Sequence, residues 1–235
     1  MTGVRDGALA VGRVASLQVG GPQTYPWLGR ELTTSIFKSR VTGPVAVRGV
    51  NLEGDDQTDR QVHGGVDRVV YAYAREDLDW WASQLRREVE DGSMGENLTL
   101  IGSDVTGAVV GERWRVGTAL LQVSEPRTPC WKIGLRMGDP RFPRRFAAAR
   151  RPGAHLRLLE PGIVQIGDDV AVEARPAHGV TLADIVAVYF GDTDDVAPLL
   201  TAPELSEHWR VWAAHRTVGR LDEERKGIGA DKGAA

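Results

Sequence analysis

The side chain most able to do chemistry is a single cysteine, Cys130, in the segment SEPRTPCWKIG. Arg127 and Lys132 bracket it, and nearby positive charge favours the thiolate, the form of cysteine that attacks electrophiles and binds metals. Pro126 and Pro129 fix the backbone φ angle at two neighbouring points, so a stiff loop is expected here. This pattern suits a metal ligand or a nucleophile. A free cysteine is also commonly a small buried hydrophobic residue, so this stretch alone leaves both interpretations open.

A second group of candidates lies in residues 34–41, which are expected to form a strand. Strand alternation would place Ile36, Lys38 and Arg40 on one face. Two cations on one face at the mouth of a barrel could hold an anion. The alternative is a face in contact with solvent.

The long polar stretch of residues 51–68 is a third candidate, because long ordered loops are often functional. His63 directly precedes Gly64 and Gly65, and Asp67 and Arg68 follow. Paired glycines let the backbone approach a ligand and turn its N–H groups toward it. His63 could exchange a hydrogen bond with that ligand, and Arg68 could clamp an oxyanion. The alternative is a tight turn with an exposed histidine.

Glu96 and Asn97 follow a glycine at the start of another expected strand. A carboxylate beside a carboxamide can recognise the donor-rich edge of a heterocycle. The same two residue types also form local hydrogen bonds in turns, so this alternative stays open.

Short strands separated by glycine and proline must position these residues, and that arrangement predicts a barrel or a sandwich. The expected strands are residues 11–19, 34–41, 45–50, 69–74 and 97–101, a hairpin over 109–126, and closing strands at 155–162 and 170–175. In the hairpin, alternation directs Trp114, Val116, Leu121 and Val123 inward.

Helices are expected where apolar residues recur every three or four positions. One covers residues 75–90, and a short basic helix covers 139–151. After Pro176 come three short helices: one with a capping box formed by Thr181 and Asp184, one over residues 195–200, and one beginning at Pro203 with a stripe of Leu205, Trp209 and Trp212.

The expected organisation is a β-barrel domain over residues 1–175, a three-helix segment over 176–220 that packs on the barrel, and a disordered tail over 221–235. His208 and His215 are expected at the surface.

Composition narrows the class of protein. The 235 residues have a formal net charge of −3, which argues against broad binding to nucleic acid. One cysteine cannot form an internal disulfide. We see no signal peptide and no apolar run long enough to span a membrane, so a cytoplasmic protein is expected.

Three ordered blocks carry a resemblance to a known family: LEGDDQTDRQVHGGVDR, MGENLT and SEPRTPCWK. Together they resemble the MOSC domain family, which binds molybdenum cofactor, and most closely its YiiM-like type with a three-helix C-terminal segment. The resemblance covers residues 11–216. One small departure is Glu112, where relatives more often carry aspartate.

The resemblance implies a MOSC β-barrel holding a pyranopterin–molybdenum cofactor, with Cys130 as the protein ligand to the metal and the catalytic residue. It makes the cations candidates for the cofactor's phosphate and polar edge, and the histidine, glutamate and asparagine candidates for the pterin. The implied cofactor-binding residues are Lys38, Arg40, His63, Gly64, Asp67, Arg68, Glu96, Asn97, Arg127 and Lys132. The family is also associated with pyridoxal phosphate binding.

The activity implied is reduction of small N-hydroxylated compounds, such as hydroxylaminopurine-like bases or amidoximes. The chain has no flavin or nicotinamide motif, so the electrons are expected from a separate flavin-type reductase. One alternative is a cofactor carrier or sulfur-transfer protein with a persulfide on Cys130, and another is a metal-free barrel that binds small molecules. The sequence leaves the oligomeric state open.

Overall fold

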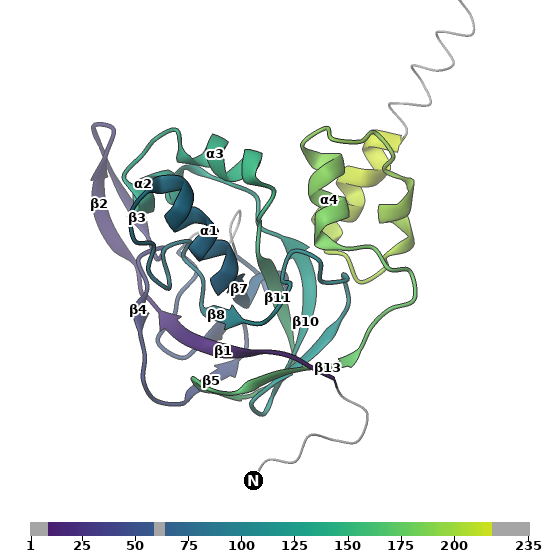
Figure 1. The fold of residues 1–235 in the computed structure, drawn as a ribbon, viewed down its shortest axis with the longest axis horizontal. Coiled ribbons are helices and arrows are strands. Elements are labelled where there is room, and N and C mark those ends of the chain that lie inside the picture. Colours follow the sequence, from purple (N-terminus) through teal and green to yellow (C-terminus); the bar gives the residue numbers. More distant parts are fainter. Residues whose placement is uncertain (1–8, 59–63, 218–235) are drawn as a thin grey trace, which may run out of the picture.

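A computed structural model describes residues 9–58 and 64–217 of the chain. Its centre is a β-barrel, drawn in Figure 1 with helices over one end and a separate helical cluster at one side. Within the described residues, seven strands close the barrel in the order β13-β9-β10-β11-β7-β8-β1, and β1 pairs with β13 to complete the ring. The barrel prediction is therefore confirmed.

The barrel strands are antiparallel to their neighbours except for β7 and β8, which are parallel. Their bounds are β1 Leu9–Val19, β7 Val70–Ala74, β8 Leu98–Ile101, β9 Arg113–Val116, β10 Ala119–Pro126, β11 Ala154–Glu160 and β13 Asp169–Ala174. Most of the strands expected from the sequence thus overlap a strand of the structure.

Smaller strands flank the barrel. The hairpin β2 (Gln23–Trp27) and β3 (Arg30–Thr34) projects from it, and β12 (Gly162–Val164), β5 (Val45–Arg48) and β6 (Asn51–Leu52) form a three-stranded sheet. The two-residue strand β4 (Ser39–Arg40) pairs with β1.

The predicted strand over residues 34–41 is wrong. β3 ends at Thr34 and β4 begins at Ser39, so residues 35–38 belong to no strand. The period-two alternation that would have aligned Lys38 with Arg40 does not apply there. Lys38 has a side chain only 8% exposed, whereas Arg40 is exposed.

The barrel interior is apolar. Trp114, Val116, Leu121 and Val123 are buried in the main core, as the alternation of the hairpin predicts. The same core continues into the C-terminal helices through Leu182, Ile185, Leu205 and Trp209, among others. These helices therefore pack on the barrel, which confirms that expectation.

Three helices cover one end of the barrel: α1 (Arg75–Leu85), α2 (Trp131–Met137) and α3 (Phe142–Ala149). A second apolar cluster joins them to β7 and includes Tyr73, Trp81 and Phe146. The expected helix over 75–90 ends early because Arg86 adopts a left-handed conformation with φ 52° and caps it. α2 was not predicted.

The C-terminal segment contains α4 (Leu182–Tyr189), the 3₁₀ turn η2 (Ala197–Thr201) and a helix over residues 207–217. The capping box of Thr181 and Asp184 is confirmed. The last helix begins at residue 207, so the prediction that it starts at Pro203 is wrong. His208 and His215 are exposed, as expected.

Residues 218–235, with the expected disordered tail, lie outside the described part. In the described chain, no helix has both the length and the apolar composition to cross a membrane.

Candidate functional site

Six of the predicted site residues line one pocket of about 130 Å³ at the end of the barrel covered by α2. They come from all three sequence blocks and from the segment before β4. These residues are Lys38, Arg68, Asn97, Arg127, Cys130 and Lys132.

Cys130 lies between the end of β10 and the start of α2. Its backbone is extended, with φ −139° and ψ 175°, and it occupies the N-cap position of α2. Its carbonyl accepts a hydrogen bond from the N–H of Ile133 at 3.2 Å. The side chain is half-buried and belongs to neither apolar cluster. Cys130 is therefore a pocket residue rather than a small buried hydrophobic one.

Arg127 is held by contacts on several sides. Its guanidinium donates to the carbonyl of Met94 and lies over the rings of Tyr71 and Phe146, at 5.0 and 5.7 Å from their centroids. Burial alone would lower the pKa of Arg127, but the Tyr71 hydroxyl and the Cys130 sulfur raise it, and the net shift is upward. The Cys130 sulfur thus contributes to the electrostatic stabilisation of the charged form of Arg127.

Lys38 belongs to a buried polar network with Asp55 and Asn97. The Nζ of Lys38 donates to Oδ1 of Asp55, which also accepts the N–H of Gly20 at 2.8 Å. Oδ2 of Asp55 accepts from Nδ2 of Asn97 at 2.9 Å, and Oδ1 of Asn97 accepts the N–H of Tyr71 at 3.0 Å. The network joins the loop after β6 to β7 and β8.

Burial is the main influence on the pKa of Lys38, because removing an ammonium from water disfavours the charged form. The pKa is lowered from 10.5, although the Asp55 carboxylate opposes the shift. A cation with a lowered pKa in a pocket is a candidate for moving a proton.

This shift predicts a difference between the wild-type protein and a Lys38→Arg variant at alkaline pH. Between the lowered pKa and 10.5 the unfolded chain binds a proton that the folded chain has released, so the folded state gains stability as the pH rises. Arginine stays charged throughout this range. Urea titrations from neutral pH to about 10.5 should show the free energy of unfolding of the wild type rising relative to the variant. If the free energies of unfolding of the two proteins change with pH in the same way, the lowered pKa of Lys38 is contradicted.

Glu96 does not line the pocket, and its carboxylate faces the turn before β8. It accepts the N–H groups of Gly92 at 2.6 Å and Met94 at 3.0 Å, and the hydroxyl of Thr99 at 3.0 Å. The side chain is fully buried, and burial raises its pKa although these donors oppose the shift. This geometry matches the turn-forming alternative.

Of the other four predicted residues, the three that the structure describes are not found in the lining of the first pocket. Arg40 is exposed on β4 and outside the pocket lining. Asp67 pairs with Arg157 at 2.8 Å and, with Gly64, lines a second cavity of about 550 Å³. His63 lies outside the described residues.

The second cavity adjoins the first, because Arg68, Glu125 and Thr128 line both. Glu125 is 1% exposed, accepts from Nε of Arg68 through Oε1, and accepts from the hydroxyl of Ser206 through Oε2. Tyr189 from α4 lines the far side. Ser206 of the C-terminal segment thus contacts Glu125, a buried carboxylate that lines both cavities.

Sequence reasoning missed Asp55, Tyr71 and Glu125. Asp55 belongs to the block LEGDDQTDRQVHGGVDR. The adjacent carboxylates of Asp55 and Asp56 in that loop could have identified it. Tyr71 lies within strand β7, among apolar neighbours that carry no signal of a site. Glu125 lies near the end of β10 inside the SEPRTPCWK block, where the cysteine and its flanking cations carried the signal. Among the described residues, no group of three or more His, Cys, Asp or Glu side chains could hold a metal ion.

Comparison with known proteins agrees with this architecture. A family model described as the MOSC domain matches residues 59–171. The uncharacterized protein YflK of Bacillus subtilis is 31% identical over 201 residues, which span 84% of this chain and 91% of YflK. A protein named reductase from Gibberella moniliformis is 32% identical over 153 residues, which are 63% of this chain and 27% of that protein.

Among solved structures, YiiM from Geobacillus stearothermophilus is similar to this chain with a TM-score of 0.72 and 28% identity. The alignment covers 87% of this chain and 98% of that YiiM. The similarity to YflK extends over most of both sequences, and the similarity to YiiM extends over most of both structures. The chain therefore belongs to the MOSC domain family and to its YiiM-like group.

Proposed function

We propose that this protein is a molybdenum-cofactor-dependent reductase of small N-hydroxylated compounds, which receives its electrons from a separate reductase. The observation that carries the proposal is the position of Cys130, a half-buried sulfur in a pocket that Lys38, Arg127 and Lys132 also line. MOSC domains are associated with molybdenum cofactor, and one relative is named a reductase.

The side chains of the pocket suit this cofactor. Cys130 offers a soft sulfur ligand, and thiolates are the protein ligands preferred by soft metal centres. The cations suit a phosphate and other anionic oxygens. The pocket of about 130 Å³ and the cavity of about 550 Å³ beside it share Arg68, Glu125 and Thr128, so the two lie next to each other along an extended molecule.

The chain's own residues have distinct roles in this proposal. The cofactor supplies the two-electron chemistry that removes the oxygen atom. Cys130 would hold the metal, and Arg127 would stabilise the negative charge of its sulfur. Lys38 carries a proton at Nζ, and its lowered pKa makes it a better acid than an ordinary lysine when the hydroxyl oxygen leaves as water. Asp55 and Asn97 fix the position of Lys38.

Direct assay tests the proposal. Protein purified from a host that makes the cofactor should contain molybdenum by elemental analysis. With a chemically reduced viologen as the electron source and no oxygen present, it should convert a hydroxylaminopurine to the aminopurine and an amidoxime to the amidine. Loaded protein that reduces neither substrate would overturn the reductase proposal and leave a carrier. Protein that contains no molybdenum would overturn the cofactor assignment itself.

A further inference from the structure

The basic helix α3 is a feature that the proposed site does not use. Residues 131–151 contain seven lysine or arginine residues and one aspartate, although the whole chain has a net charge of −3. This segment therefore has a formal net charge of +6, and the rest of the chain has −9. A local charge of this kind directs the approach of an oppositely charged partner.

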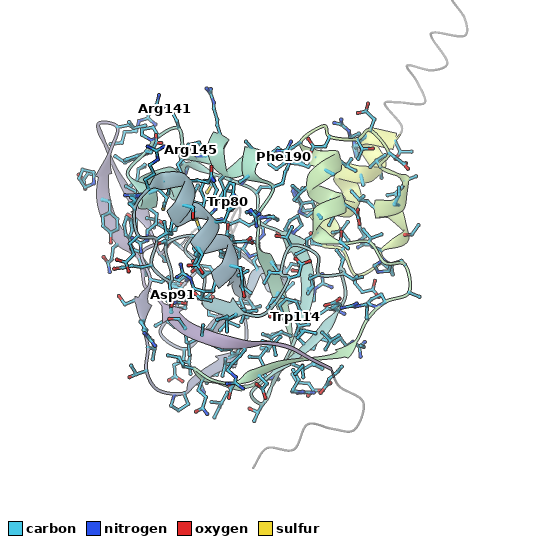
Figure 2. All side chains as sticks on the ribbon, viewed as in Figure 1. Trp80, Asp91, Trp114, Arg141, Arg145 and Phe190 are labelled. Atoms are coloured by element: carbon cyan, nitrogen blue, oxygen red, sulfur yellow. The ribbon has the colours of Figure 1, made fainter. Side chains whose placement is uncertain are left out.

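Packing fixes the direction in which α3 presents its charge. Phe142 and Phe146 are 1% and 2% exposed and pack into the apolar cluster with Trp81. The opposite side of α3 and its N-terminus carry the arginines, and Figure 2 shows Arg141 and Arg145 at the end of the molecule near α2 and α3. We call Arg141, Arg144 and Arg145 the basic face.

The basic face is exposed and poorly neutralised. The side chains of Arg141 and Arg145 are 87% and 44% exposed, and each approaches Asp139 only at 3.7 and 3.9 Å. Arg144 is exposed and forms no ion pair within the described part of the chain. At these distances in water a single aspartate offsets little of three positive charges.

The three other arginines of the segment are held by the fold, and Arg136 lies over the ring of Phe37, 5.2 Å from its centroid. Arg150 forms a two-pronged pair with Asp192 at 2.5 and 2.6 Å, and Arg151 pairs with the buried Asp77. Among residues 9–58 and 64–217, no carboxylate pairs with the basic face as closely as this, so its charge is available to a partner.

The basic face lies close to the pocket. α2 begins directly after Cys130 and contacts α3, and its seven residues extend about 10 Å. On the inner side of α3, Phe146 lies 5.7 Å from the guanidinium of Arg127, which lines the pocket. α3, which like any helix is about 10 Å across, therefore has the ring of Phe146 near Arg127 on one side and the basic face on another.

We propose that the basic face of α3 is the docking surface for a small acidic redox protein that delivers electrons to the pocket. This inference rests on the proposed reductase function. Reduction of one N–OH group consumes two electrons and two protons and yields an N–H group and water, and the acidic partner supplies both electrons. Charge complementarity sets the encounter rate of such pairs, and it accounts for a basic face on an acidic chain.

The test compares two electron sources with the loaded protein. The variant carries Arg141→Glu, Arg144→Glu and Arg145→Glu, and the control carries Arg13→Glu, Arg48→Glu and Arg210→Glu. Arg13 and Arg48 are 63% and 67% exposed on β1 and β5, and Arg210 is exposed on the last helix. Both variants change the net charge equally. The electron sources are reduced viologen and an acidic flavodoxin kept reduced by its own reductase.

With flavodoxin at low salt, the α3 variant should lose at least about 10-fold in kcat/KM, and the control variant should not. The difference should vanish near 1 M salt, where the screening length is about 3 Å. With viologen, both variants should match the wild type.

Four outcomes would overturn the docking surface: equal loss in both variants, loss with viologen as well, an unchanged α3 variant, or tighter binding of single-stranded DNA than of flavodoxin. If wild-type protein is inactive even with viologen, the reductase proposal fails. Calorimetric titration of oxidised flavodoxin then tests the basic face separately, and equal affinity for wild type and the α3 variant refutes it.

Discussion

Replacing Cys130 with serine is expected to abolish molybdenum retention and N-hydroxy reduction together. Serine keeps the shape of the side chain but offers a hard oxygen in place of a soft sulfur. Groups that merely support a metal ligand change affinity or activity by 10–100-fold, so loss of the ligand itself should cost about 100-fold or more. Elemental analysis and the viologen assay, run on the same preparations, measure both quantities.

The fold should survive this substitution, which makes the result interpretable. Cys130 is half-buried and lies outside both apolar clusters, so the free energy of unfolding should change by less than about 1 kcal/mol. A matched control is Ser83→Ala, a similar-sized change on the exposed side of α1. If the Cys130→Ser protein keeps both molybdenum and activity, Cys130 is neither the metal ligand of the proposed reductase nor the persulfide carrier of the alternative.

Replacing Asp55 with alanine is expected to destabilise the fold by about 3–5 kcal/mol. The side chains of Asp55 and Lys38 are 5% and 8% exposed, so the substitution leaves a buried ammonium without its partner. It also removes the acceptor for the N–H of Gly20 and for the amide of Asn97. Chemical denaturation monitored by circular dichroism measures the change.

The matched control is Glu53→Ala, which removes another carboxylate from the same loop. Glu53 pairs with Arg48 at 2.9 Å, but their side chains are 61% and 67% exposed. Surface pairs of this kind contribute about 0–1 kcal/mol. If the two substitutions cost the same, the Lys38–Asp55–Asn97 network does not stabilise the pocket. Adding Lys38→Met to Asp55→Ala should restore part of the lost stability, because the unpaired ammonium is then absent.

The barrel could be predicted because its signal is local. Alternating apolar residues and the glycine and proline turns between them identify strands without knowledge of their partners. Trp114 and Val123 show this, since alternation alone predicted that both are buried. α2 was missed because its seven residues are shorter than two full periods of an apolar stripe. The early end of α1 depends on the backbone conformation of Arg86, which the apolar stripe does not report.

The candidate site could be predicted only in part. Cys130 and Arg127 were identified because their segment is distinctive in itself. Glu96 and Asn97 are adjacent in sequence, yet Glu96 faces a turn and Asn97 faces the pocket. Lys38 reaches the pocket from a segment without strand geometry, whereas Arg40 on β4 is exposed.

The sequence by itself determined the barrel, the helical C-terminal segment and the cysteine of the pocket, because repeated local patterns and an ordered set of motifs encode them. Only the tertiary structure decided which polar side chains surround Cys130. Asp55 and Asn97 are 42 residues apart, and Glu125 and Ser206 are 81 apart. Such pairs form when distant strands and helices close around the barrel, and neither partner's neighbours in the chain carry information about the other.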